Sequence, residues 1–579
     1  MSSKTLSLCV ALIFTLVAFA PLASACDTWI AMGDSTYNGR ILFGKNSDRP
    51  PFDCQPLIYN PQQFWGANAT LKLEYIEIPQ VGYTYATIGA SPYWCYGYEM
   101  GMNEFGVVVG NEAVHTYALE QNKLTPPERG LLGMDMLRIG LERGQTAREV
   151  MDTITLLLET YGQWGSGAPG QDDNTGSYDN SFIIADSTEA WILESAGRDW
   201  VAKRIAEGTD SISNVISLQS DWDEGSIAEG TNFKLLYSNE ADPVSLSGES
   251  RELRSQRLLD QYSADGDKVT LQEMMAIARD HEVSVPGICM HPIPMLSDSV
   301  SAGSWVVSLP SKQGEFIELW WCAYFPCQGI YVPAFFTPYG FPDIASNAGT
   351  LGKSVSAPND VAPDEFKIDS YWWLFKKAAD DQMDDERRTS FNSLEQGFID
   401  KLDTMRPETE HLFSSGGWSL AYANLTLFTE ESMDSTLSLL ISEKLSGIDT
   451  ESPTITDLKP ETGISLSDNN LRASSLFNDN VKVDRSRVRI MLDGTDVTDD
   501  SSISSDGFSL NTILNGAKGD AHDLSIEIFD VAGNKASMNS VFSAGGPSGD
   551  EGETPGFGAI ALLSIVLLAF VVRNIKRKK

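Results

Sequence analysis

A cysteine that directly follows a short apolar leader is the feature that most constrains this chain. The leader is apolar from residue 6 to residue 22 and ends in Ala23-Ser24-Ala25, which has the small-x-small pattern of a signal-peptidase cleavage site. Residues 1–25 are therefore predicted to be a signal peptide. Cleavage after Ala25 would make Cys26 the new N-terminus, so that a thiol and a free α-amine stand on one residue.

Three roles for Cys26 are open from its position alone. Its α-amine would have an ordinary pKa of about 7.7–8.0, so Cys26 could be a nucleophile that carries its own general base. A cysteine after a leader can also carry a lipid, although Ala23 stands where a large aliphatic residue is expected. Exported proteins also use cysteines in disulfides. The residues that follow Cys26 favour the nucleophile.

The charge of the chain limits its partners. The 579 residues include 80 acidic and 42 basic ones, for a formal charge of −38. Phosphate binding needs a basic patch, so no nucleic acid is expected as a partner. An acidic surface is typical of a solvated extracellular protein. The length leaves room for two or three domains with one large core.

The C-terminal end carries a second apolar segment. Residues 557–573 precede a basic tail at 574–579, and the segment is predicted to be a transmembrane anchor with the tail in the cytoplasm. The triplet Pro555-Gly556-Phe557 resembles the archaeal sorting signal named after its Pro-Gly-Phe motif, in which the tail is removed and a lipid is attached. Both interpretations place the protein on the extracellular face of the cell membrane.

The cysteines and histidines suggest no metal site. Besides Cys26 the mature chain would have five cysteines, an odd number, and their pairing cannot be read from the sequence: Cys54, Cys95, Cys289, Cys322 and Cys327. No CxxC pair and no HExxH motif is present. His115, His281 and His291 have no spacing typical of ligands and are expected to be structural. The sequence therefore predicts no catalytic metal and no cofactor.

The order of elements indicates an α+β protein. A strand from Cys26, a turn at Asn38-Gly39 and a second strand predict a hairpin at the mature N-terminus. Amphipathic helices are expected at 131–142, 147–161 and 271–280, with Thr146 and Thr270 as N-caps of the last two, and most of 369–445 is expected to be helical. Antiparallel strands with helices grouped around them are typical of a layered α+β domain.

The character of the chain changes near residue 448. Residues 450–545 are rich in strand-forming runs and short turns and contain no cysteine, which predicts a small all-β, immunoglobulin-like sandwich. The acidic, glycine-rich stretch 546–556 is predicted to be a flexible linker. The sandwich is expected to act as a spacer between the catalytic part and the membrane.

Eight strings in the N-terminal part resemble one family. Cys26-Asp27-Thr28 followed by GKNSDRP (44–50) resembles the C69 peptidase family, the dipeptidase and secernin group of N-terminal-nucleophile hydrolases. The resemblance covers roughly residues 26–430 and continues in family order through 101–114, 133–150, 177–186, 189–204, 211–218, 288–292 and 301–309. It implies an αββα sandwich, two antiparallel sheets between helical layers, over a peptidase domain at 26–445.

The resemblance also implies catalytic residues. Cys26 Sγ would attack an amide carbonyl, and its α-amine would take the thiol proton. Asp48, at the end of the strand paired with that of Cys26, would orient the amine and support its positive charge. Asn111 and Asn214 match oxyanion and substrate-binding asparagines of the related bile-salt and penicillin acylases, although either could instead cap a turn.

Two basic residues are candidates for substrate binding. Lys45 stands where the acylases have an arginine, and an ammonium cannot form the bidentate fork of a guanidinium. A catalytic arginine is therefore not carried over to this position. Arg49 could bind a substrate carboxylate instead.

Together these features predict a surface-anchored, cysteine-type dipeptidase that hydrolyses short peptides through a thioester on Cys26. An amidase or acylase of N-acyl compounds would use the same fold and the same residues. A non-enzymatic surface binding protein, with Cys26 lipidated or in a disulfide, is the alternative from a different class. The oligomeric state is not predicted.

Overall fold

The computed structural model describes residues 26–545 except 282–286, 294–296, 313, 380–384, 446–448 and 505. The predicted signal peptide at 1–25, linker at 546–556, membrane segment at 557–573 and tail at 574–579 all lie outside the described residues. Among the residues that are described, no helix is both long enough and apolar enough to cross a membrane.

The chain divides into two compact units. Unit 1 holds the residues up to Pro453 together with 479–487 and 529–535, and unit 2 holds 454–478, 488–528 and the residues from 536 on. The predicted boundary near 448 thus lies close to the main division. Two short stretches of the predicted sandwich nevertheless pack with unit 1, where Lys482 Nζ pairs with Asp434 Oδ1 at 2.5 Å.

The hairpin predicted at Cys26 lies in the first sheet of unit 1. β1 (Cys26–Ala31) pairs antiparallel with β2 (Leu42–Arg49), so that Cys26 lies opposite Ser47. The chain turns between them at Gly39, whose φ of 74° favours glycine. The six strands run in the order β14 (Thr209–Ile212), β1, β2, β16 (Val300–Ser308), β17 (Glu318–Cys322) and β18 (Val332–Ala334).

The second sheet of unit 1 has eight strands and faces the first. β1 contacts β10 (Val108–Val114) across the two sheets. The strand order is β15 (Glu224–Gly225), β13 (Asp199–Ile205), β12 (Ala190–Ala196), β11 (Asp179–Ala185), β10, β9 (Met100–Asn103), β8 (Thr87–Ala90) and β3 (Leu57–Asn60).

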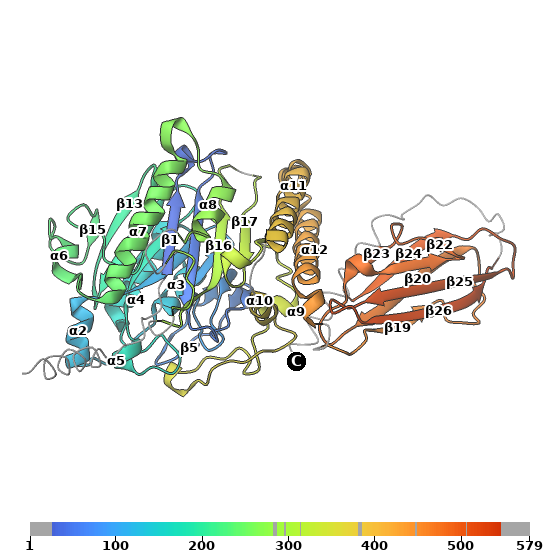
Figure 1. Cartoon of the computed structure of the whole chain (residues 1–579), viewed down its shortest axis with the longest axis horizontal. Coiled ribbons are helices and arrows are strands. Elements are labelled where there is room, and N and C mark those ends of the chain that lie inside the picture. Colours follow the sequence, from blue (N-terminus) through green and yellow to red (C-terminus); the bar gives the residue numbers. More distant parts are fainter. Residues whose placement is uncertain are drawn as a thin grey trace, which may run out of the picture. The chain divides into compact units, whose positions relative to one another are not determined.

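Helices cover the outer faces of both sheets (Figure 1). α7 (Pro243–Tyr262) and α8 (Leu271–Ala278) pack on the first sheet, and α3 (Gly133–Arg143) and α4 (Ala147–Tyr161) on the second. Thr146 and Thr270 cap α4 and α8 as predicted, each accepting from a backbone N–H three residues on. Unit 1 therefore combines helices and antiparallel strands, as expected.

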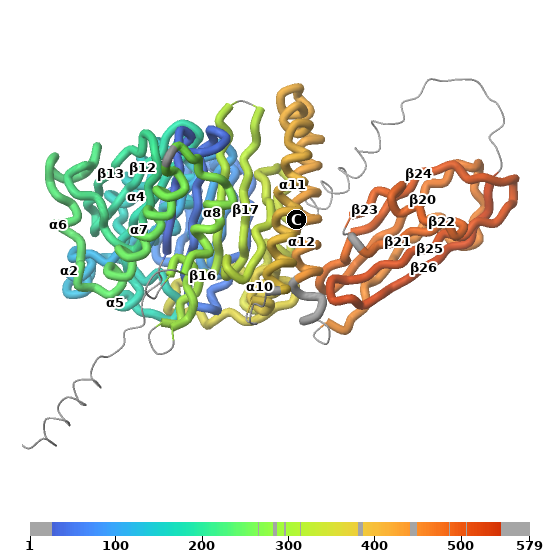
Figure 2. The backbone as a smooth tube through the Cα atoms, turned by 45° about the horizontal axis from the view of Figure 1, so that its top comes forward, coloured from blue at the N-terminus to red at the C-terminus, as the bar shows by residue number. Residues whose placement is uncertain are grey.

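The remaining elements of unit 1 are shorter or follow the sheets. α10 (Tyr371–Ala379), α11 (Asp385–Ser415) and α12 (Trp418–Leu445) account for the helical region expected at 369–445, and α11 and α12 run side by side (Figure 2). The others are β4 (Gln63–Phe64), β5 (Thr70–Lys72), β6 (Glu77–Pro79), β7 (Tyr83–Thr84), α2 (Tyr117–Leu124), α5 (Asp173–Gly176), α6 (Phe233–Tyr237) and α9 (Asp343–Ser346).

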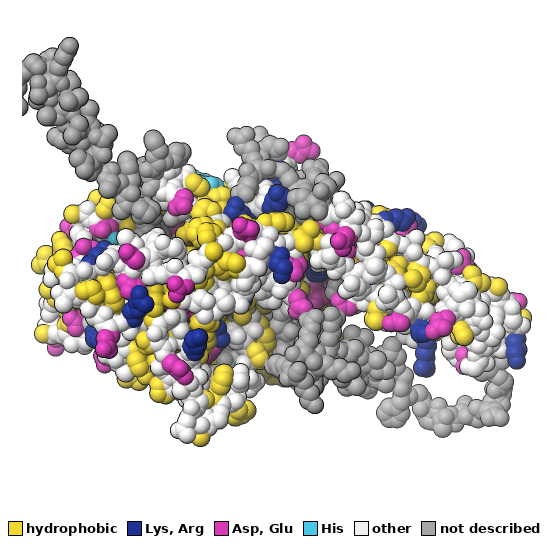
Figure 3. Space-filling model, turned by 90° about the horizontal axis from the view of Figure 1, so that it is seen from below, with side chains coloured by type: hydrophobic (Ala, Val, Ile, Leu, Met, Phe, Trp, Pro, Cys, Tyr) yellow, Lys and Arg dark blue, Asp and Glu magenta, His cyan; other side chains and the backbone are white. Residues whose placement is uncertain are grey.

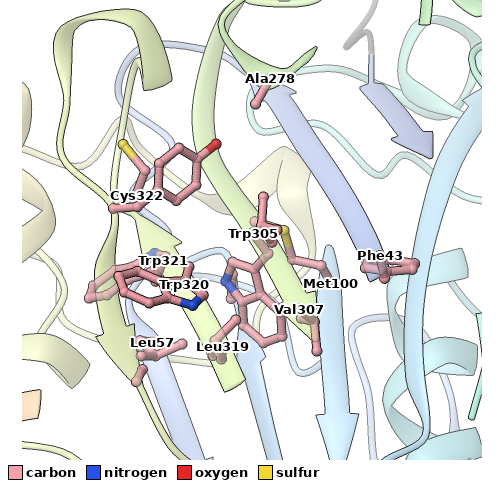
Figure 4. Close-up of a cluster of buried hydrophobic side chains, with 14 of the residues drawn as sticks. Phe43, Leu57, Met100, Ala278, Trp305, Val307, Leu319, Trp320, Trp321 and Cys322 are labelled. Atoms are coloured by element: carbon pink, nitrogen blue, oxygen red, sulfur yellow. The ribbon is translucent and has the colours of Figure 1, made fainter. Parts of the chain in front are cut away.

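Large aromatic side chains fill the core beside the first sheet. Trp305, Trp320 and Trp321 are completely buried on β16 and β17. Figure 4 shows Trp305 close to Val307 and Met100, with Leu319 near them. Burying an aromatic ring of this size stabilises a fold by about 1.5–3 kcal/mol, so this cluster helps to fix the strands that carry the site.

Unit 2 contains two four-stranded antiparallel sheets. One has the order β19 (Thr454–Lys459), β20 (Asn470–Asn478), β24 (Gly507–Ile513), β23 (Ser502–Ser504), and the other β22 (Thr495–Asp496), β21 (Arg489–Leu492), β25 (Ala521–Phe529), β26 (Lys535–Ser543). Every second residue of β20 and β25 is buried or half-buried, so each strand turns one face to a core. The immunoglobulin-like topology stays a prediction.

The charged side chains are dispersed on the face of the molecule drawn in Figure 3. Acidic and basic groups lie there among polar and hydrophobic ones, and the basic groups of that face form no continuous patch.

Candidate active site

Cys26 begins β1, and both its nitrogen and its sulfur have partners. The backbone nitrogen donates to Asn214 Oδ1 at 2.7 Å, and Sγ accepts from the backbone N–H of Asp48 at 3.4 Å. The residue is 3% exposed. Burial raises the pKa of the Cys26 thiol above its ordinary value, and the ammonium of Lys45 opposes that shift. The thiol therefore needs a base before it can act as a nucleophile.

Asn214 lies two residues after β14, and its side chain is held at both ends. Oδ1 accepts from the Cys26 nitrogen and from the guanidinium of Arg251, while Nδ2 donates to Ala113 O at 2.6 Å. The amide thus has one defined orientation, in which its oxygen points at the nitrogen of Cys26. In a mature chain this oxygen would orient the α-amine.

A buried ion pair supports this arrangement from α7. Arg251 Nε donates to the two carboxylate oxygens of Asp27 at 3.2 and 3.1 Å, and Nη2 donates to Ser213 Oγ at 2.9 Å. Ser213 Oγ in turn lies 2.6 Å from Asp27 Oδ1. Arg251 and Asp27 are both completely buried. Breaking a pair of this kind leaves an uncompensated charge in the interior. We call Cys26, Asp27, Asn214 and Arg251 the nucleophile centre.

A glycine lets α7 come close enough for this contact. A Cβ added at Gly248 would lie 2.7 Å from the backbone carbon of Asn214, which is too close for any side chain. Gly248 is three residues before Arg251, so both lie on the face of α7 that meets the sheet. The absence of a side chain at 248 therefore allows Arg251 to reach Asn214 and Asp27.

Asp48 lies at the end of β2 next to the sulfur of Cys26. Ser301 Oγ on β16 donates to Asp48 Oδ1 at 2.6 Å, and Oδ2 has no hydrogen-bond partner among the described residues. Burial and the nearby Asp27 raise the pKa of the Asp48 carboxyl well above its usual range, and Arg251 opposes the shift. An ammonium on a mature Cys26 would lower this pKa again.

Lys45 is buried in the interior of the site with a carboxylate partner. Its Nζ donates to Asn111 O at 2.6 Å and to Glu112 Oε1 at 3.1 Å. Burial by itself would lower the pKa of Lys45, but Cys26 and Glu112 raise it above its ordinary value. Burial raises the pKa of Glu112 to about 7, although Lys45 opposes this. The ammonium thus brings a positive charge toward the sulfur.

The Asn111 side chain lies on the face of β10 that is turned away from the first sheet. Its neighbours Gly110 and Glu112 face Lys45, and the alternation of strand residues turns Asn111 to the other side. Its Nδ2 donates to Asn180 Oδ1 at 3.0 Å, and its Oδ1 is buried without a partner among the described residues. An amide nitrogen carries two protons, so one N–H of Asn111 is left for another acceptor.

Arg49 is occupied by carboxylates of the protein itself. Its Nη2 lies 2.7 Å from Asp53 Oδ2 and its Nη1 3.3 Å from Glu99 Oε1, and Nη2 also donates to Gly167 O at 2.8 Å. Arg49 is 1% exposed. A substrate carboxylate would have to compete with these partners.

The structure brings together Cys26, Asp48, Lys45 and Asn214, whereas Asn111 reaches the site only through its backbone carbonyl. It adds two residues that the sequence did not point out. Asp27 is part of the Cys26-Asp27-Thr28 string, but nothing in that string predicts its ion pair with Arg251. Arg251 lies 224 residues along the chain from Asp27, in a helix without a local motif. A buried arginine is the only signal that marks it, and burial becomes visible only in the fold.

A small hollow lies at the end of β10. Its volume is about 10 Å³, roughly the space of one water molecule. It is lined by Ala113, His115, Ala168, Gln171, Thr175, Gly176, Ser177 and Tyr178. One lining residue, Ala113, also accepts from Asn214 Nδ2 through its carbonyl.

Several solved structures show a distant similarity to this chain. A single-site mutant of conjugated bile acid hydrolase from Clostridium perfringens is 14% identical, covering 54% of this chain and 97% of its own, with a TM-score of 0.29. An N-acylethanolamine-hydrolyzing acid amidase ortholog from Caenorhabditis elegans is 12% identical, covering 50% and 94%, with a TM-score of 0.24. CopC from Methylosinus trichosporium OB3b is 13% identical, covering 18% and 100%, with a TM-score of 0.14.

Residues 25–224, which include Cys26, Asp48, Asn111 and Asn214, match the model of Peptidase family C69.

Proposed function

We propose that the mature protein begins at Cys26 and is a cysteine-type amide hydrolase of the N-terminal-nucleophile kind, acting on short peptides and on dipeptides in particular. The observation that carries the proposal is the 2.7 Å hydrogen bond between the Cys26 nitrogen and Asn214 Oδ1, beside a sulfur that accepts from the Asp48 N–H. The match of residues 25–224 to Peptidase family C69 supports an amide hydrolase.

The reaction proceeds in two steps on Cys26. Sγ attacks the carbonyl carbon of the scissile amide while the α-amine takes the thiol proton, and the amine proton is then given to the leaving nitrogen as the C–N bond breaks. Water attacks the resulting thioester with the amine again acting as base, which releases the acid and restores the thiol. Asn214 and Asp48 hold the amine in place through both steps.

The oxyanion of each tetrahedral intermediate needs preorganised donors. The second N–H of Asn214 Nδ2 is one candidate, because its other proton already goes to Ala113 O and fixes the amide. The buried ammonium of Lys45 interacts electrostatically with Cys26 and is hydrogen-bonded to Asn111 O. A positive charge at that position favours negative charge on the sulfur and on the oxyanion.

The proposal includes the architecture and the location of the protein. Two facing antiparallel sheets with helices on their outer faces support the αββα sandwich of N-terminal-nucleophile hydrolases. The apolar run before Ala25 supports export. The apolar segment at 557–573 with its basic tail supports anchoring at the extracellular face of the membrane, and two four-stranded sheets support an immunoglobulin-like spacer.

The test is to express the full chain with its leader, determine the mature N-terminus by intact mass, and assay kcat/KM on a panel of dipeptides and of N-acyl amino acids. We expect a free Cys26 at the N-terminus and dipeptide hydrolysis that Cys26→Ala abolishes. Cys322→Ala, which changes another buried cysteine, is the matched control and should retain activity. Hydrolysis of the N-acyl compounds alone would replace the dipeptidase by an amidase.

A blocked or lipidated Cys26 would contradict the nucleophile. Activity in Cys26→Ala equal to that of the unchanged protein would do the same, and either result would favour the binding-protein interpretation.

A further inference from the structure

Two cysteines and two histidines of unit 1 converge on one point outside the nucleophile centre. His281 follows α8, Cys289 and His291 lie in the segment 287–293, and Cys327 lies in the short helical turn Pro326–Gln328 after β17. One donor atom of each side chain lies within 4.8 Å of the donor atoms of the other three. We call these four residues the Cys/His cluster.

The distances from His291 to the other three ligand atoms are close to those in a coordination shell. His291 Nε2 lies 3.2 Å from His281 Nε2, 3.1 Å from Cys327 Sγ and 3.6 Å from Cys289 Sγ. With Zn–N distances of about 2.0–2.1 Å and Zn–S distances of about 2.3 Å, ligand atoms at the corners of a tetrahedron lie roughly 3.3–3.8 Å apart. The observed separations are close to that range.

Hydrogen bonds alone cannot satisfy this arrangement. A neutral imidazole nitrogen either donates one proton or offers one lone pair, so His291 Nε2 can make one good hydrogen bond. Three donor atoms nevertheless surround it, from His281, Cys289 and Cys327. A cation among the four atoms would accept a lone pair from each of them and remove the conflict.

We propose that the Cys/His cluster binds one zinc ion. Two thiolates and two imidazoles are a donor set that Zn²⁺ takes in structural sites, whereas Ca²⁺ and Mg²⁺ prefer oxygen. Binding would release the two thiol protons of Cys289 and Cys327. All four positions are filled by the protein, so the site is closed and structural, with no position for substrate.

The burial of the four ligands differs, which leaves one side of the Cys/His cluster open to solvent. Cys289 and Cys327 are buried, His291 is half-buried and stacks on Phe325 with ring centroids 4.2 Å apart, and His281 is exposed. The sulfur ligands thus lie toward the core, and the imidazole side gives the ion a route of entry.

The ion would fix the position of the segment 287–293, which contacts the residues around Asp48. Between the ligands Cys289 and His291, the backbone N–H of Met290 donates to Ser301 Oγ at 2.9 Å, and Ser301 Oγ donates to Asp48 Oδ1 at 2.6 Å. Just before them, Ile288 O accepts from Asn46 Nδ2 on β2 at 2.9 Å. By joining this segment to Cys327, the ion would fix the hydrogen-bond partners of Ser301 and Asn46. The ion itself would lie outside the nucleophile centre.

The test uses the full chain, purified with an affinity tag that contains no histidine and dialysed against metal-free buffer. Elemental analysis should find about one zinc per chain, and Co²⁺ exchanged into the site should give the thiolate charge-transfer and d–d absorption of a tetrahedral complex. Cys327→Ser and His281→Gln should lose the zinc and the cobalt spectrum. Cys54→Ser, another buried cysteine, should keep both.

Because Cys327→Ser could fail to fold, His281→Gln decides the matter: this histidine is exposed, and its replacement leaves the core intact. Zinc content that is unchanged in folded His281→Gln and in Cys327→Ser would overturn the proposal. A metal-free wild-type protein would overturn it as well, whether its mass shows two free thiols or the loss of two hydrogens in a Cys289–Cys327 disulfide. These measurements do not depend on peptidase activity, so they separate this proposal from the proposed function.

Discussion

The nucleophile centre and the Cys/His cluster are both built around buried cysteines in unit 1, yet they are completed in different ways. In the nucleophile centre donors and acceptors balance: Arg251 meets Asp27, Asn214 accepts from Cys26, and its amide donates to Ala113. In the cluster three donor atoms surround a single nitrogen of His291. A balanced network is complete as it stands, whereas convergent, unbalanced ligand atoms support the proposed zinc site.

The two sites are also joined. Ser301 Oγ accepts from Met290, which lies between two ligands of the cluster, and donates to Asp48 beside the sulfur of Cys26. If the nucleophile centre carries the chemistry and the Cys/His cluster is structural, changes in the centre should lower activity strongly. Changes in the cluster should lower stability more than activity.

The largest effect is expected when the buried ion pair is broken. Arg251→Met leaves the carboxylate of Asp27 uncompensated in the interior and removes one partner of Asn214. We expect the free energy of unfolding to fall by about 3–5 kcal/mol, measured by urea denaturation. Arg257→Met, which changes an exposed residue of the same helix, should stay within about 0.5 kcal/mol of the wild type. Equal stability of the two variants would show that the pair does not hold the centre together.

The two asparagines should differ in how much activity their replacement costs. Asn111→Ala removes an amide that donates to Asn180 on the helix side of the second sheet, so it should change kcat/KM and its pH profile little. Asn214→Ala removes the acceptor that orients the Cys26 nitrogen, so it should lower kcat by about 10²–10³-fold and shift the pH dependence of kcat/KM. Steady-state kinetics across pH on a dipeptide tests both. Identical pH profiles in the two variants would contradict the division of roles.

The sequence predicted those parts of the site that follow from local order. The hairpin that begins at Cys26 brings Asp48 next to its sulfur, because Cys26 lies opposite Ser47 in the strand register. The same register places Lys45 opposite Thr28. Each of these residues belongs to a short string, and the spacing of strand residues is fixed by the pleat.

Contacts between distant segments could not be predicted in this way. Arg251 reaches Asp27 across 224 positions, and this depends on the close approach of α7 at Gly248. The sequence predicts structural roles for His281 and His291, because they have no spacing typical of metal ligands. Ten residues separate them, and Cys327 lies 36 residues beyond His291. Such spacings match no zinc motif, and only the packing of the 287–293 segment against the turn at Pro326–Gln328 brings the ligands together.

A smaller effect should come from the carboxyl group of Glu112. Burial raises its pKa to about 7, with Lys45 and Asp27 as charged neighbours, so the folded state favours the neutral acid. Its contribution to stability is therefore complete below the unfolded pKa of about 4.3 and is lost as the pH rises through about 7. Glu112→Gln should flatten the urea midpoint over this window, and Glu128→Gln, at an exposed site, should not. If the urea midpoint of the wild type instead rose from about pH 4.3 to pH 7, and Glu112→Gln removed that rise, the sign of the Glu112 contribution would be the opposite of the one expected here.

The smallest effect on chemistry is expected from removing the metal. A closed site with four protein ligands offers no position to substrate or water, so His281→Gln or a chelator should change kcat/KM by less than about tenfold at a temperature where the protein stays folded. The thermal midpoint should fall in the same samples, since an ion that binds only the folded state stabilises it. Re-adding zinc should restore the midpoint of the chelated wild type but not that of His281→Gln. A structural ion can affect Cys26 only indirectly, through the positions of Ser301 and Asp48. If the folded, metal-free protein were as inactive as Cys26→Ala, the ion would have to take part in the chemistry.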